Sequence, residues 1–382
     1  MKTTKTIILA LAAIALCAAA FWLTSKKSFK TPPSIGRPIL PEFNVENVAR
    51  VEITGAKSLI LSNGEHGWTV DALHGFPAKT KTVLEELDKL KELKSGPIAA
   101  GVPCTNTVVV LKDASGNPLA KLEMGAHHRS TRTSGEMAQF GGGGFPDGRY
   151  VKMGESTVVV GDTLDVFDGD PKKWVETRIC SINAGDVQTV TCTKGKENVK
   201  LTRKNSSWTL EGLGPKEELD TSKTYPLESA LSYLSFSDVI DPKKTEAELG
   251  FATGAVYTAT LKNGITYTAK VGNKIGADYA FKVSAAFKSV GTNATENAAC
   301  EKTVKEFNDT VGKWTYAIPT YKAESMFKAR KDLVKAKEEP KKEEAKPAPA
   351  PAPKPAAKPT PKPAAKPAPA PAMRNDERQR SS

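Results

Sequence analysis

A duplicated segment occupies the middle of the chain, and it limits the possible fold more than any other feature of the sequence. The first copy contains V-A-R-V-E-I at 48–53, L-I-L at 59–61 and W-T-V at 68–70, and the second contains V-Q-T-V-T-C at 187–192, V-K-L at 199–201 and W-T-L at 208–210, an offset of 139 to 140 residues. Apolar residues at alternate positions are typical of strands that bury one face. The duplication therefore predicts two similar sheets in succession along the chain.

Both copies continue with the same kinds of element. The helical spacing of Val83, Leu87, Leu90 and Leu93 recurs at Leu227, Ala230, Leu231 and Leu234, and strand-like segments at 107–111, 119–125 and 149–153 recur at 256–261, 265–272 and 278–283. Asn263-Gly264 is a strong hairpin signal, because both residue types tolerate a positive φ. A closing segment that ends at Trp174 recurs 140 residues later at Trp314. We expect these two tryptophans to be equivalent anchors in the two cores, because tryptophan buries a large apolar area.

These patterns predict an α+β protein. We expect two tandem copies of a mainly antiparallel β-sheet with one or two packed helices, at 45–180 and 181–333, after a linker at 31–44. An N-terminal membrane segment at 1–30 and a disordered Pro/Ala/Lys-rich tail at 334–382 complete the predicted organisation.

The N-terminus has the pattern of a signal-anchor. Lys2 and Lys5 precede an uncharged run that is apolar over the 17 residues 7–23, which is near the lower length limit for a membrane span. Three interpretations compete: a retained single-pass anchor, a signal peptide cleaved after the small residues 18–20, and a lipoprotein modified at Cys17. All three predict export, so we expect a cell-membrane protein with its body in the periplasm or otherwise outside the cytoplasm.

The basic charge of the chain lies at its two ends. The net charge is +12, residues 1–30 carry five lysines and no acid, and residues 334–382 carry twelve Lys and Arg against six Asp and Glu. The middle is therefore nearly neutral, which excludes a uniformly basic nucleic-acid-binding domain, and we expect no nucleic-acid partner. The tail holds 12 of the 26 prolines and is expected to be an extended spacer. A basic tether to anionic envelope polymers or lipid headgroups is the alternative.

The order of these segments resembles that of the DUF4340 family of bacterial membrane-anchored proteins. The resemblance rests on three segments. The first is the opening strand pattern V-x-x-V-x-I, L-x-L, W-T-V, the second is the helix segment F-P-A-K-T-K-T-V-L-E-E-L-D-K-L-K-E-L-K-S-G at 76–96, and the third is the hairpin pattern L-K-D, G, L-x-M-G, R-Y-V-K. Together they cover roughly 45–330. The family is similar to parts encoded beside gliding-motility-type ABC transporters. The resemblance therefore implies an exported, anchored accessory protein whose partner is a membrane protein such as an ABC-type transporter subunit.

Catalytic and metal-binding motifs give no positive signal. The sequence lacks G-x-S-x-G, H-E-x-x-H and a P-loop, and the glycines at 141–144 are not followed by the lysine that coordinates phosphate. The acids at 162, 165, 168 and 170 lack the order of an EF-hand, and the acids at 85, 86, 88 and 92 fit the solvated side of a helix. We expect no catalytic residue, no cofactor and no metal.

One loop distinguishes the first copy from the second. It spans 126–148, where the second copy has only 273–277. Because adjacent strand residues point to opposite faces, we expect His127 and His128 not to share one metal ion. A copy-specific loop is the best candidate for partner binding. The candidate contact residues are His127, His128, Arg129, Met137, Phe140 and Phe145.

Four cysteines, at 104, 180, 192 and 300, lie in the expected exported body, where disulfides are permitted and three pairings are possible. Cys192 occupies the position of Ile53, so we expect it to be a small buried residue. The absence of C-x-x-C argues against redox catalysis.

Taken together, the sequence predicts a non-enzymatic, membrane-anchored envelope protein that acts as a scaffold or binding accessory of an ABC-type transport or motility complex. The alternative is an exported carbohydrate-binding or hydrolytic module that acts on envelope polymers. The alternative requires a cleft with paired carboxylates at glycosidase separation.

Overall fold

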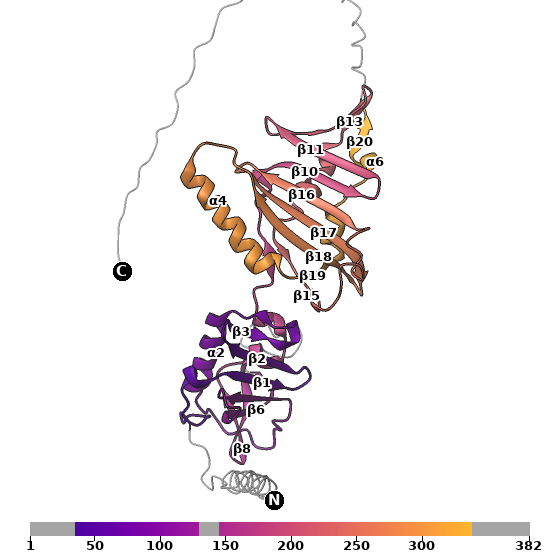
Figure 1. Cartoon of the computed structure of the whole chain (residues 1–382). Helices are drawn as coiled ribbons and strands as arrows, with labels where there is room; N and C mark the ends of the chain where they lie inside the picture. Colours follow the sequence, from indigo (N-terminus) through magenta and orange to yellow (C-terminus); the bar gives the residue numbers. More distant parts are fainter. Residues whose placement is uncertain (1–34, 130–144, 338–382) are drawn as a thin grey trace, which may run out of the picture. The chain divides into compact units, whose positions relative to one another are not determined.

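The computed structural model describes residues 35–129 and 145–337. Over these residues the chain consists mostly of antiparallel β-sheet with a few helices (Figure 1), as the α+β prediction requires. The expected membrane segment at 1–30 and nearly all of the expected tail lie outside the described ranges. Among the helices that are described, none has both the length and the apolar content needed to cross a membrane.

The first eight-stranded sheet, which we call sheet 1, has the order β4-β3-β2-β1-β5-β6-β7-β8. Its strands are β1 (Arg50–Thr54), β2 (Leu59–Gly64), β3 (Gly67–Val70), β4 (Phe76–Pro77), β5 (Thr107–Lys112), β6 (Pro118–Arg129), β7 (Pro146–Met153) and β8 (Ser156–Val160). Burial alternates along them, as in β5, because one face packs inward and the other faces outward.

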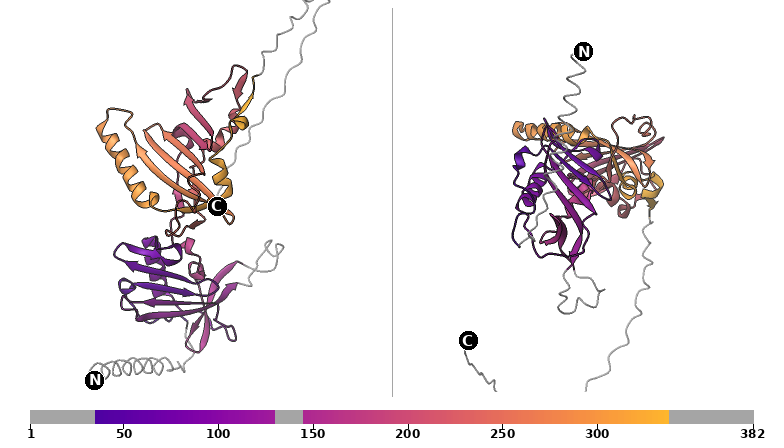
Figure 2. Two further views of the ribbon diagram at one scale, coloured as in Figure 1. Left: turned by 45° about the vertical axis from the view of Figure 1, so that its right-hand side comes forward. Right: turned by 90° about the horizontal axis from the view of Figure 1, so that it is seen from below.

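The second eight-stranded sheet, sheet 2, has the order β12-β11-β10-β16-β17-β18-β19-β15. Its strands are β10 (Val187–Lys194), β11 (Glu197–Lys204), β12 (Ser207–Leu210), β15 (Asp238–Val239), β16 (Ala255–Leu261), β17 (Ile265–Ile275), β18 (Asp278–Phe287) and β19 (Tyr316–Pro319). Two further pairs are β9 (Arg178–Cys180) with β14 (Leu234–Ser235) and β13 (Glu217–Leu219) with β20 (Val334–Ala336). Figure 2 shows the strands of each large sheet from two further directions.

The strand orders confirm the internal repeat. β3-β2-β1-β5-β6-β7 in sheet 1 corresponds to β12-β11-β10-β16-β17-β18 in sheet 2, and β8 and β19 take the next place. The predicted turn at Asn263-Gly264 joins β16 to β17, and Gly264 has a φ of +84°. We refer to the parts that contain sheets 1 and 2 as repeat 1 and repeat 2.

The helices differ between the repeats. In repeat 1, α2 (Thr80–Glu92) buries Val83, Leu87 and Leu90 as the spacing predicts. In repeat 2, the helix expected from Leu227 to Leu234 is one turn only, α3 (Tyr225–Glu228). The other helices of repeat 2 are α4 (Ala294–Phe307), α5 (Thr320–Ser325) and α6 (Arg330–Leu333). Figure 1 shows α4 running along sheet 2, and its Phe307 ring lies 5.1 Å from that of Tyr267.

The predicted equivalence of Trp174 and Trp314 is wrong. Trp174 follows β8 and the short helix η5 (Pro171–Lys173), whereas Trp314 precedes β19, the counterpart of β8. The cause is an insertion: β7 and β8 are joined by a tight turn, but α4 and η8 (Asn308–Gly312) lie between β18 and β19. The equal spacing of the two tryptophans is therefore a coincidence of loop lengths.

Two segments at the edges of the predicted domains take part in the fold. Within the expected linker, Leu40 and Phe43 are buried, and Pro38 forms a bridge with Lys94. At the other end, β20 pairs with β13, three residues into the segment expected to be tail.

The cysteines at 104, 180, 192 and 300 are all free thiols. Cys192 is fully buried, which confirms the prediction made from its match with Ile53. Burial raises the pKa of the Cys180 and Cys192 thiols to about 12, because a thiolate would lose its hydration. These two groups are therefore protonated, unreactive parts of the core.

Candidate functional site

The hairpin of β6 and β7 contains a β-bulge that organises the site. Met124 pairs with Val151, and the next pair is His127 with Arg149, so three steps along β6 oppose two along β7. A Cβ atom on Gly125, inside the bulge, would lie 2.6 Å from a backbone carbonyl oxygen. The bulge therefore needs glycine at this position. Bulges turn side chains out of the regular pattern and are common beside functional sites.

Arg149 is the buried centre of the site, with a side chain that is only 4% exposed. Its Nη1 donates to a carboxylate oxygen of Asp168 at 2.6 Å and to the carbonyl oxygen of Thr163 at 3.3 Å. Its Nε donates to the carbonyl oxygen of Gly125 at 3.1 Å. A buried charge is tolerated only when it is paired and hydrogen-bonded in this way. The guanidinium thus ties the hairpin to η4 (Asp165–Asp168), the short helix that follows β8.

His127 lies between the guanidinium and a second carboxylate. Its Nε2 is 2.6 Å from Oδ1 of Asp165 and 3.4 Å from Nη1 of Arg149. Thr163 donates its hydroxyl hydrogen to Oδ2 of Asp165 at 2.9 Å. Partial burial raises the pKa of the Asp165 carboxyl, but the hydrogen bonds from His127 and Thr163 outweigh it, so the net pKa is lower than usual.

This lowered pKa predicts a pH-dependent contribution to stability. A carboxyl whose pKa is lower in the folded state stabilises the protein fully above its ordinary pKa of about 3.9, and that contribution is lost as the pH falls below this value. We expect Asp165→Asn to cost about 0.5 kcal/mol near pH 6, the scale of an exposed ion pair, and progressively less towards pH ~3. The measurement is urea unfolding of both proteins across this range.

Glu155→Gln is the control for that comparison, since Glu155 is exposed in the turn between β7 and β8. A difference between wild type and Asp165→Asn that stays constant with pH would contradict the assignment of the ion pair.

His128 faces a different set of groups, as expected for the neighbouring residue in a strand. Its Nδ1 is 2.7 Å from Oδ1 of Asp147, and its ring meets the ring of Tyr150 edge-on at 5.6 Å. Arg129 ends β6 and pairs with Pro146 in the ladder. Beside this last pair lies Phe145, which is 78% exposed.

Four of the six residues predicted from the sequence lie along or beside the β6–β7 ladder, namely His127, His128, Arg129 and Phe145. The other two, Met137 and Phe140, lie outside the described residues. Sequence reasoning missed the partners that fix these side chains: Asp147, Arg149, Asp165 and Asp168. No local pattern reveals them, because Asp165 is 38 residues from His127 and the contact depends on the bulge.

The cluster of His127, Asp165 and Asp168 contains three side chains of the types that bind metal ions. One ligand atom from each of His127, Asp165 and Asp168 lies within 4.8 Å of the others, and zinc binds imidazole and carboxylate. However, the guanidinium of Arg149 already bonds to Asp168 and lies beside His127. Its fixed positive charge would oppose a second cation at the same place. The geometry therefore favours a structural ion-pair network over a metal site.

Comparison with known proteins gives one family. Residues 68–253 match the model described as "Domain of unknown function (DUF4340)". The match begins in β3 of repeat 1 and ends just before β16 of repeat 2, so it includes parts of both repeats. No curated protein and no solved structure matches the chain. The family match supports the assignment of this chain to the DUF4340 family that its sequence resembles.

Proposed function

We propose that this chain is a non-enzymatic, membrane-anchored protein of the cell envelope, and that it binds a partner protein through the base of the β6–β7 hairpin. The observation that carries the proposal is the set of hydrogen bonds that the buried Arg149 side chain donates to Gly125, Thr163 and Asp168. These bonds connect the hairpin to the segment that follows β8. A surface held in one geometry loses less conformational entropy when it binds. Phe145 stands exposed beside this fixed base and offers the apolar anchor that protein interfaces commonly use.

The two repeats support this choice of surface. In sheet 2, the counterparts of β6 and β7 are joined by a two-residue turn at Gly276-Ala277, and β17 pairs with β18 up to Ile275 and Asp278. The hairpin of repeat 1 is longer and carries the ion pairs His127–Asp165 and His128–Asp147. A feature present in one copy only is not needed to build the sheet, and loops of this kind often carry function.

The partner that we propose is a membrane protein, in particular a subunit of an ABC-type transport or motility complex. This step rests on the signal-anchor pattern of residues 7–23 and on the resemblance to DUF4340 proteins. Both features support a location of the body beside a membrane and outside the cytoplasm, in the periplasm or its equivalent.

Phe145→Ser should weaken binding of the partner about thirtyfold and reduce crosslinking accordingly, because loss of a buried aromatic anchor costs about 2 kcal/mol or more. The measurement is crosslinking and mass spectrometry of the full-length protein in its own membranes. The matched control is Val290→Ser, since Val290 is 67% exposed in repeat 2. Equal loss of crosslinks in both variants would point to non-specific contacts.

The same sample gives the mature N-terminus. A start at Met1 or Thr3, together with transporter subunits among the crosslinks, supports the anchored accessory. A start at Phe21 with no membrane partner contradicts it and favours the alternative, an exported protein that acts on soluble envelope polymers.

A further inference from the structure

The bulge of repeat 1 has a counterpart in repeat 2. In sheet 2, Val271 pairs with Phe281, and the next pair is Lys274 with Tyr279. This is again three steps on one strand against two on the next. Because β17 and β18 occupy the places of β6 and β7, Lys274 stands at the position of His127 and Tyr279 at that of Arg149. The two repeats therefore have a β-bulge at the same place but carry different side chains on it.

What lies against the bulge differs between the repeats. In repeat 1, η4 packs against the bulge: Asp165 bonds to His127 and Asp168 bonds to Arg149. In repeat 2 the corresponding place after β19 is taken by α5, and a cavity of about 510 Å³ remains there. Cavities of roughly 300–1,000 Å³ are typical of small-molecule sites.

Two glycines among the residues that line this cavity pack closely against neighbouring backbone. A Cβ atom on Gly254 would lie 1.9 Å from the carbonyl oxygen of Val271, and one on Gly272 would lie 2.1 Å from that of Leu249. Both positions line the cavity and admit only glycine. The segments that carry them are therefore in close contact at the wall of the cavity.

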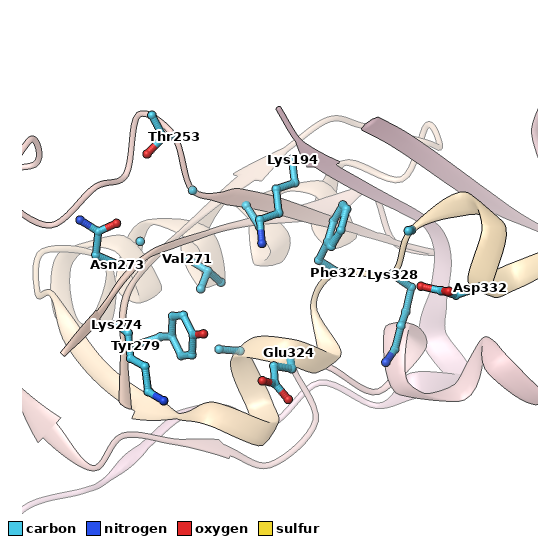
Figure 3. Close-up of a pocket in the computed structure, with 15 residues that line it drawn as sticks. Lys194, Thr253, Val271, Asn273, Lys274, Tyr279, Glu324, Phe327, Lys328 and Asp332 are labelled. Carbon is cyan, nitrogen blue, oxygen red and sulfur yellow. The ribbon is translucent and has the colours of Figure 1, made fainter. Parts of the chain in front are cut away.

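The walls combine two aromatic rings with charges of opposite sign. Figure 3 shows Tyr279 and Phe327 on two sides of the hollow, with the ammonium group of Lys194 and the carboxylate of Glu324 on the other two. Nζ of Lys194 is 5.5 Å from the centre of the Phe327 ring. Over the described residues, neither Lys194 nor Glu324 has an ion-pair partner within 4.0 Å. Lys274, Lys328 and Asp332 also line the cavity.

We propose that this cavity binds a short peptide with free ends. Its carboxylate would pair with Lys194, its amino group would pair with Glu324, and an apolar side chain would lie against Val271, Tyr279 and Phe327. A simple anion would face the repulsion of Glu324, and a simple cation would face that of Lys194. A zwitterion satisfies both charges at once, and charge-assisted hydrogen bonds are the strong ones.

The test is calorimetric titration of the full-length protein in detergent with four probes: the tripeptide Ala-Phe-Ala with free ends, its N-acetylated form, its C-amidated form and free phenylalanine. We expect the free-ended tripeptide to bind about tenfold more tightly than either capped form. Lys194→Gln and Glu324→Gln should each weaken its binding about tenfold. Weaker binding of phenylalanine would show that peptide length matters.

Two comparisons make the test specific. Lys196→Gln should bind like wild type, because Lys196 is exposed in the β10–β11 turn, two residues after Lys194, but does not line the cavity. In Glu324→Gln, N-acetylation should cause no further loss, since the carboxylate that the amino group needs is already gone. The proposal is overturned if no probe binds, if capped and free peptides bind equally, or if phenylalanine binds as tightly as the tripeptide.

Discussion

Replacing Trp174 with alanine is expected to lower the free energy of unfolding by about 3–5 kcal/mol. Trp174 is among the largest fully buried side chains, with 1% of its surface exposed, and its ring packs edge-on against Phe167 at 5.5 Å. Its carbonyl oxygen accepts a hydrogen bond from the Lys79 amide at 2.7 Å, at the start of α2. Removing the indole leaves a large void where η4, η5 and α2 come together. The measurement is urea unfolding followed by circular dichroism.

Trp174→Phe should cost clearly less than the alanine variant. Within the described part of the chain, the indole nitrogen of Trp174 has no hydrogen-bond partner. Phenylalanine therefore loses apolar contact but no hydrogen bond. Tyr225→Ala is the control on the surface, since Tyr225 is 65% exposed. An equal loss of unfolding free energy in Trp174→Phe and Trp174→Ala would contradict this account, because it would require a hydrogen bond from the indole nitrogen.

The features of the fold that the sequence predicts well are those set by local patterns. Alternating apolar residues define β1, β2 and β5 and their counterparts β10, β11 and β16. The apolar stripe of Val83, Leu87 and Leu90 defines α2. Each of these patterns records which face of an element is buried, and burial dominates the energetics of such elements.

The features that the sequence does not predict lack such a stripe. None of the residues of α4 is fully buried, so its sequence carries no clear helical periodicity. At α3 the sequence predicts a longer helix than the structure contains. Leu227 and Leu231 are both buried, as the spacing predicts, but Leu231 lies beyond the end of the helix. Apolar spacing over two turns cannot distinguish a helix from a turn packed on a core.

The candidate site shows the same limit. The sequence singles out His127 and His128 by their type and by the length of the loop, but their partners come from other segments. Asp165 reaches His127 only because the bulge at Gly125 turns the strand towards η4. A bulge is a property of strand register, which depends on long-range pairing. The same bulge recurs in repeat 2 at Gly272, so register was duplicated with the sheet while the side chains around it diverged.

Asp168→Ala is expected to destabilise the protein by about 3 kcal/mol, because it leaves the guanidinium of Arg149 buried without its carboxylate. The reverse change, Arg149→Met, should cost less. Asp168 is 35% exposed and can be solvated by water when its partner is removed, whereas Arg149 is 4% exposed and cannot. The measurement is urea unfolding of the two single variants and of the double variant at one pH and salt concentration.

The double variant decides whether burial of the charge is the cause. Asp168→Ala combined with Arg149→Met removes both charges and keeps an unbranched apolar side chain in the core, so we expect it to recover about half or more of the loss seen in Asp168→Ala alone. Glu155→Ala, in the nearby β7–β8 turn, should leave stability unchanged. Losses that simply add would mean that Arg149 and Asp168 act independently. The hairpin base would then lack the charged anchor on which the proposed binding surface depends.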